Sequence, residues 1–238
     1  VPILEHPNIR RDLLSMKARV EGVRALVMKL SNHGDRMRAT QGKDDESEAY
    51  HKGQVDLLTP LVKAYGTDAA FEVSSRAIQV YGGHGYLKDY PVEQYCRDSK
   101  IFQIYEGTNF IQSMDLVSRK LGQAGGANTQ AFLTDIQKFI NENKDTPELE
   151  EAVGHLQNAH EAVAASDMQL IGWFKGGKLE HIPLGAEDFL VIMSELAVGW
   201  LLLDQASIAL KKLPETSETH PDHAFYMGKK FTAQFFAN

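Results

Sequence analysis

The chain has little of what secreted, metal-bound or membrane-spanning proteins need. Cys96 is the only cysteine among 238 residues, which excludes an internal disulfide and a zinc or iron–sulfur site built from cysteines. The longest strongly apolar stretch, Leu196 to Leu203, is far shorter than the roughly 18–20 residues that cross a bilayer. We therefore expect a soluble protein without a membrane span. The scarcity of cysteine fits a reducing compartment, and we expect a cytoplasmic location.

Positive charge is also scarce. There are 25 basic and 32 acidic residues, a net charge of −7, which argues against a nucleic-acid partner because phosphates attract a basic surface. The basic residues are concentrated at the start, where residues 1–40 hold eight of them against four acidic ones. A solvated helix face and a contact with a phosphorylated ligand both remain open explanations.

The start of the chain carries no basic stretch followed by an apolar one, so no export signal is visible. The first residue is Val1 and not methionine. We therefore expect the chain to be processed or cut from a longer protein.

Alternation of apolar and polar residues, the mark of a β-strand, is missing outside short pieces, whereas three- and four-residue apolar spacing recurs throughout. The expected fold class is all-α, an up-and-down helical bundle followed by a second helical layer or small helical domain. The expected helices are 10–30, 55–81, 91–104, 109–121, 129–141, 147–173, 185–212 and 221–236.

A segment of small residues, 122–128, is the best candidate for a domain boundary. It divides the chain into a bundle of residues 1–122 and an additional helical domain of residues 128–238. Beyond it, Thr146 followed by Pro147 predicts a capped helix start.

The common hydrolase and phosphate-binding signatures are absent. His220 and His223 lie three residues apart, but two imidazoles without a third ligand do not make a metal site, and none is expected. The glycine-rich stretch from Tyr81 to Tyr86 follows a predicted helix, which is typical of a helix-terminating loop. Closely spaced glycines also let backbone N–H groups approach a phosphate or another chain.

A second glycine stands at the mouth of a predicted helix, directly after Glu106 and among apolar side chains. A carboxylate at this place is commonly a partner of the helix dipole. The functional alternative is a general base, because apolar neighbours raise the pKa of a carboxyl group toward the operating pH.

Several motifs in order resemble the C-terminal part of the flavin-dependent acyl-CoA dehydrogenases, which are oxidoreductases of fatty acid metabolism. These motifs are Gln79 to Tyr86, Tyr90 to Glu93, Arg97-Asp98 with Ile101, and Ile104 to Asn109 with Ile111-Gln112. Further pieces are similar to a bacterial subgroup that includes the methylmercaptopropionyl-CoA dehydrogenases and carries an additional C-terminal helical segment. These pieces are His6 to Arg11, Leu58 to Pro60, Thr67-Asp68 and Asp115 to Leu121. Residues 128–238 resemble the subgroup more loosely.

The resemblance implies that Glu106 removes the α-proton of an acyl-CoA thioester while the β-hydrogen leaves as hydride to FAD, giving a trans-2-enoyl-CoA. It implies that Thr108 and Asn109 contact FAD. It also implies that a loop approaches the adenine-side half of an FAD held mainly by a neighbouring subunit. That loop is formed by Gln79, Val80, Tyr81, Gly82 and Gly83. The expected partners are acyl-CoA and an electron-transfer flavoprotein, and the expected full-length assembly is a homodimer or homotetramer.

The sequence departs from the family at Phe110, where many members carry a glutamine. The family's N-terminal helical and middle β domains have no counterpart in these residues, so we expect a C-terminal piece of a longer enzyme that is inactive by itself. An acyl-CoA oxidase of the same family and a non-catalytic oligomerisation or docking module remain the alternatives.

Overall fold

The computed structural model describes all 238 residues, Val1–Asn238, and contains eight α-helices and no strand. The all-α expectation is therefore confirmed. None of the helices combines the length and apolar character that a bilayer crossing requires. The helices are α1 (Pro7–Thr40), α2 (Asp45–Tyr81), α3 (Val92–Lys100), α4 (Asn109–Asp115), α5 (Ala127–Asn143), α6 (Glu150–Lys175), α7 (His181–Lys212) and α8 (His223–Ala237).

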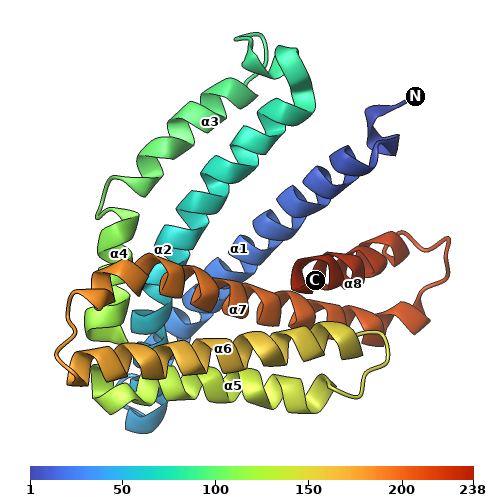
Figure 1. Ribbon diagram of the computed structural model, residues 1–238. Coiled ribbons are helices and arrows are strands. Elements are labelled where there is room, and N and C mark those ends of the chain that lie inside the picture. Colours follow the sequence, from blue (N-terminus) through green and yellow to red (C-terminus); the bar gives the residue numbers. More distant parts are fainter.

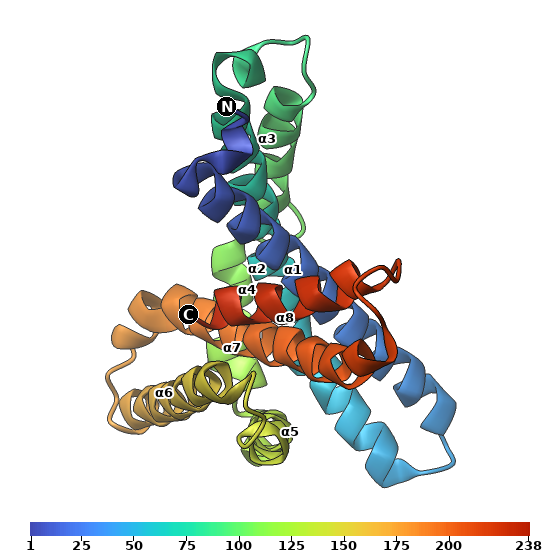
Figure 2. The ribbon, with the colours of Figure 1, turned by 90° about the vertical axis from the view of Figure 1, so that its right-hand side faces the viewer.

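The helices form two sets that cross each other (Figure 1). Helices α1 and α2 make a long antiparallel pair, and α3 folds back against the second half of α2. Helices α5 to α8 run across this pair, with α7 packed against α1, α2, α4, α6 and α8 (Figure 2). The first set carries both motifs of interest, and the second braces it from one side.

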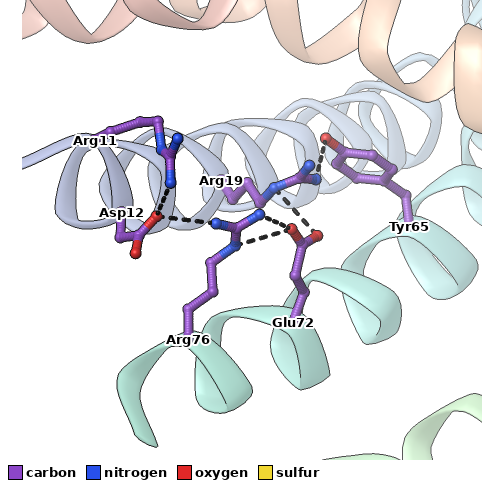
Figure 3. A network of polar contacts seen from close by, with 6 residues as sticks. All are labelled: Arg11, Asp12, Arg19, Tyr65, Glu72 and Arg76. Carbon is purple, nitrogen blue, oxygen red and sulfur yellow. Dashed lines mark hydrogen bonds and ion pairs between the residues drawn. The ribbon is translucent and has the colours of Figure 1, made fainter. Parts of the chain in front are cut away.

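Ion pairs along the first half of α1 fix its register on α2 (Figure 3). Arg76 donates to Glu72 at 3.0 Å and to Asp12 at 3.3 Å, and Arg19 Nε lies 3.2 Å from Glu72 Oε2. Arg19 also donates to the hydroxyl of Tyr65 at 3.4 Å. Linked pairs of this kind hold geometry better than isolated surface pairs. Part of the basic charge at the start of the chain thus serves the contact between two helices.

Helix α7 lies at the centre of the hydrophobic core, as its nearly all-round apolar sequence predicts. Met193 and Leu203 are fully buried, and Phe189 and Leu196 are 3% and 1% exposed. Side chains from both halves of the chain join α7 in one hydrophobic cluster. They include Leu26 of α1, Leu61 of α2, Phe132 of α5, Leu156 of α6 and Ala233 of α8.

The predicted start of α6 at Thr146 is wrong. The Leu149 N–H donates to the Thr146 carbonyl at 2.9 Å and closes a separate turn, and the helix begins at Glu150. Leu149 is 1% exposed, so the turn places an apolar side chain in the core before the helix starts. Burial of that leucine outweighs the cap that Thr146 would have provided.

The small-residue segment 122–128 is held on α2. The Gln54 side chain donates to the Asn128 carbonyl at 2.9 Å, and Gln123 donates to Asp56 at 3.1 Å. Its tight turn uses positive φ at Gly125 and Gly126, 68° and 87°, which glycine adopts without steric cost.

Helices α1 and α7 are in close contact at Gly22, which is buried. A Cβ built there would overlap Cγ1 of Val198 on α7. Gly154 on α6 provides the contrast, because a Cβ there would meet nothing within 4 Å. The absence of a side chain at Gly22 therefore permits this contact between α1 and α7.

We predict that Gly22→Ala lowers the free energy of unfolding by about 1–3 kcal/mol through overpacking, less the gain in helix propensity. The control Gly154→Ala should raise it by about 0.5–1 kcal/mol. Adding Val198→Ala to Gly22→Ala should recover part of the loss. Urea unfolding measures all three changes, and equal effects of the two glycine substitutions would contradict the close approach.

A pair of buried histidines lies where α1 and α2 meet the second helix set. The Nδ1 atoms of His33 and His51 are 2.9 Å apart, so one ring donates to the other and the accepting ring is neutral. Burial, aided by the charge of Lys29 and by His51, lowers the pKa of His33 to about 4. Beside them the Tyr50 hydroxyl donates to Asp135 at 2.5 Å.

Folding of this chain should weaken as the pH falls from about 6.5 to about 4. Over this window the unfolded chain binds a proton at His33 that the folded chain does not. The free energy of unfolding therefore falls by up to about 1.4 kcal/mol for each pH unit. We predict that His33→Gln reduces the stability lost between pH 7 and pH 5 by about 2 kcal/mol relative to the unmodified chain. The exposed His220→Gln should leave that loss unchanged. Urea unfolding at several pH values tests this, and parallel profiles for His33→Gln and the unmodified chain would rule the effect out.

Candidate active site

The turn between α3 and α4 holds Glu106 in an unusual backbone conformation. Glu106 has φ 55° and Gly107 has φ 86°, two consecutive residues in the left-handed region. A side chain rarely takes this conformation, which costs about 1–3 kcal/mol and persists only where neighbouring contacts enforce it. The sequence predicted a flexible glycine here but gave no sign that Glu106 shares its conformation.

Residues after the turn anchor it to α4. The Thr108 hydroxyl accepts a hydrogen bond from the Ile111 N–H at 3.2 Å and caps the helix. The predicted helix start is therefore correct. The same hydrogen bond uses one lone pair of the Thr108 hydroxyl oxygen. The hydroxyl proton is left for another acceptor.

Asn109 fastens the turn to α2. The two N–H groups of its amide have three acceptors within hydrogen-bond distance of the nitrogen: Asp68 at 2.8 Å, Thr67 at 3.0 Å and the Ala64 carbonyl at 3.2 Å. Asp68 also accepts from Gln103 at 2.6 Å, on the other side of the turn. The Asn109 side chain thus serves internal contacts to α2, whereas the resemblance implies a contact with a cofactor.

Lys63 on α2 is the one side chain that donates to the backbone of the turn. Its Nζ lies 2.6 Å from the Gly107 carbonyl oxygen and 2.8 Å from Asn109 Oδ1. Desolvation lowers the pKa of Lys63, against the opposing charges of Asp68 and Glu106. Sequence reasoning missed Lys63. The available signal was a lone lysine inside the otherwise apolar run of α2 around Leu61 and Ala64.

The Glu106 side chain is exposed, and so are the apolar side chains around it. Ile101, Ile104 and Tyr105 are 51%, 53% and 48% exposed. Nothing in these residues removes water from the carboxylate. A cavity of about 570 Å³ lies beside the turn, between α2 and the start of α7, with Asn109, Asp68 and Asp188 among its lining residues but not Glu106.

The glycine-rich loop lies at the tip of the α2–α3 hairpin (Figure 1). Helix α2 ends at Tyr81, where Gly82 takes φ 61° and its N–H donates to the Gln79 carbonyl. Gly82 and Gly83 are exposed, and a Cβ on either would meet nothing within 4 Å. Gln79 and Tyr81 are exposed as well, and Val80 is half-buried.

The structure does not bring the two motifs together. The glycine-rich loop precedes α3 and the Glu106 turn follows it, so the nine-residue helix, about 13 Å long, separates them. No group of three or more His, Cys, Asp and Glu side chains is placed to hold a metal.

Comparison with known proteins gives two family matches along the chain. Residues 1–121 match the model of the acyl-CoA dehydrogenase C-terminal domain, and residues 132–238 match a C-terminal-like domain described for acetyl-CoA dehydrogenase. The two matches together cover nearly the whole chain.

Curated relatives match over the whole chain. It is 34% identical to a broad-specificity linear acyl-CoA dehydrogenase, FadE5, of Mycobacterium tuberculosis, covering 100% of this chain and 39% of the relative. It is 34% identical to the 3-methylmercaptopropionyl-CoA dehydrogenase of Ruegeria pomeroyi, again with 100% and 39% coverage. The chain therefore spans about two fifths of the length of these relatives.

Solved structures share the fold. One is Caenorhabditis elegans ACDH-11 in complex with C11-CoA, with a TM-score of 0.75 at 18% identity, covering 98% of this chain and 36% of that one. Another is an acyl-CoA dehydrogenase from Bacillus anthracis complexed with FAD, with a TM-score of 0.70 at 22% identity, covering 99% and 39%.

Proposed function

Since this chain belongs to the acyl-CoA dehydrogenase family, we propose that it is the C-terminal part of an FAD-dependent acyl-CoA dehydrogenase in which Glu106 is the catalytic base. The observation that carries this proposal is the conformation of the Glu106 turn. An exposed carboxylate is held on a constrained backbone that is tied to a long helix, as a positioned base requires. The relatives that match the whole chain are themselves named as acyl-CoA dehydrogenases.

In the proposed reaction, the Glu106 carboxylate takes the α-proton of the acyl thioester. Bound FAD supplies the acceptor for the β-hydrogen, which leaves as hydride, so that the product is a trans-2-enoyl-CoA. The α-proton is weakly acidic, so the developing enolate needs hydrogen-bond donors at the thioester oxygen. The Glu106 N–H is one such donor, because the same turn that orients the carboxylate also fixes this backbone group.

The residues of this chain fit two separate contacts with FAD. At the tip of the α2–α3 hairpin, the open backbone of Gly82 and Gly83 leaves room for a phosphate or adenine to approach, flanked by Gln79, Val80 and Tyr81. Near the base, the Thr108 hydroxyl keeps its proton free to donate. Asn109 contributes by holding this turn and not by offering its amide.

The separation of these contacts supports an assembly in which one FAD is shared between subunits, a homodimer or homotetramer. We propose that residues 1–122 carry the base and the flavin contacts and that residues 128–238 brace them, in agreement with the boundary between the two family matches. An electron-transfer flavoprotein in the cytoplasm is the proposed electron acceptor. By itself this chain is expected to be inactive, since an exposed base without its pocket gains no rate from proximity.

We predict that Glu106→Gln in the flavin-loaded full-length protein slows the bleaching of flavin by acyl-CoA at least about 100-fold, because the amide cannot accept the α-proton. Flavin content should stay unchanged. Anaerobic stopped-flow absorbance with a panel of acyl-CoAs measures the rate, and ranks the substrates at the same time.

The matched control is Glu142→Gln, an exposed carboxylate on α5 outside both motifs. In this variant, acyl-CoA should bleach the flavin at the same rate as in the unmodified protein. Unchanged bleaching in Glu106→Gln would return Glu106 to the role of a carboxylate at a helix end and favour a non-catalytic module.

A further inference from the structure

Two consecutive left-handed residues make the Glu106 turn a conformation that must be enforced from outside. Gly107 takes φ 86° at no steric cost, but Glu106 at φ 55° does not. A turn under such strain relaxes when its contacts are removed, and the carboxylate then points elsewhere. The contacts that hold the turn therefore decide where the proposed base lies.

These contacts come from one face of α2. Asn109 and Gln103, on either side of the turn, both bind Asp68, and Thr67 binds Asn109. The contacts made by Asp68 and Thr67 thus hold only side chains that flank the turn. Lys63 alone reaches the turn's own backbone, through the Gly107 carbonyl at 2.6 Å.

Lys63 is also the positive charge that bonds the turn directly, since Lys100, the other lysine in this network, donates to the side chain of Gln103. The Lys63 ammonium group bonds both the Gly107 carbonyl and the Asn109 amide oxygen, so it links the backbone of the turn to the side chain that anchors it. Hydrogen bonds from a charged donor are roughly twice as strong as neutral ones. The carboxylate of Glu106 is close enough for its charge to act on the pKa of Lys63.

From this geometry we infer that Lys63 is a positioning residue for the dehydrogenation: by holding the Gly107 carbonyl on α2, it fixes the left-handed turn that aims the Glu106 carboxylate and backbone N–H at the substrate. Lys63 acts through Glu106 and takes no proton itself. This inference rests on the proposed function.

The test substitutes Lys63→Met, which keeps the length of the side chain but removes the donor, in the flavin-loaded full-length protein. The limiting rate of flavin bleaching at saturating acyl-CoA should fall about 10- to 100-fold, since a misplacement of about 1 Å has effects of this size. The acyl-CoA concentration at half-maximal rate and the flavin content should change less than about twofold, since the interaction serves the transition state more than binding. Lys63→Arg, which can donate to the same carbonyl, should restore most of the rate.

A second readout does not depend on turnover. Without substrate, hydrogen–deuterium exchange of the backbone amides of residues 106–109 should be faster in Lys63→Met than in the unmodified protein, while the remainder of α2 is unchanged. Lys52→Met is the control for both readouts. It removes another lysine of α2 that is exposed and makes no hydrogen bond to the turn.

Should Lys63→Met fail to fold, Lys63→Gln gives the same test. The glutamine side chain is uncharged and one atom shorter than lysine, so it cannot bond both the Gly107 carbonyl and the Asn109 amide oxygen. We expect the same loss of bleaching rate and the same faster amide exchange as for Lys63→Met.

Failure of this inference and failure of the proposed function give different results. If Glu106→Gln stops bleaching but Lys63→Met behaves like Lys52→Met in rate and exchange, the positioning role is overturned and the function stands. If Glu106→Gln itself bleaches normally, the proposed function fails and the positioning role fails with it.

Discussion

Helix α7 is apolar on almost every face, and a helix of this kind is stable in water only when other helices cover it. Here α1, α2, α4, α6 and α8 supply the cover, and they come from both halves of the chain. The two helix sets are therefore joined by one core and not by a thin interface. The close approach at Gly22 and the anchored segment 122–128 follow from the same need to bring both sets onto α7.

The proposed site depends on this core although it lies at its edge. Helix α2 is fixed by Leu57, Leu61 and Ala64, which are buried, and the polar residues of its next face point at the Glu106 turn. Lys63, Thr67 and Asp68 thus project from a rigid helix onto a segment whose backbone is strained. A site on a regular element is more precisely positioned than one on a free loop. Contacts with α2 fix the conformation of the turn, and packing against α7 fixes the position of α2.

Most of the fold could be predicted from the sequence, because three- and four-residue apolar spacing marks each long helix and because glycines mark the end of α2. The start of α6 could not, since only the folded core shows that Leu149 is buried before the helix begins. In the proposed site, the sequence predicted Glu106 and both glycine motifs. It missed Lys63, because the distance from Lys63 to the turn is set by how α2 and the α3–α4 segment pack, and residues 63 and 107 are far apart in the chain.

In the proposed function, the exposed residues of the turn indicate what this chain supplies and what a covering domain or subunit supplies. The turn already has its orientation, which α2 provides, but Glu106 and the apolar side chains next to it, such as Ile101 and Ile104, face water. A carboxylate surrounded by water is a weak base for an α-proton, and a half-exposed apolar surface around a carboxylate is what a covering domain or subunit would bury. In the proposed function, this chain accordingly orients the base, and a covering domain or subunit excludes water from it.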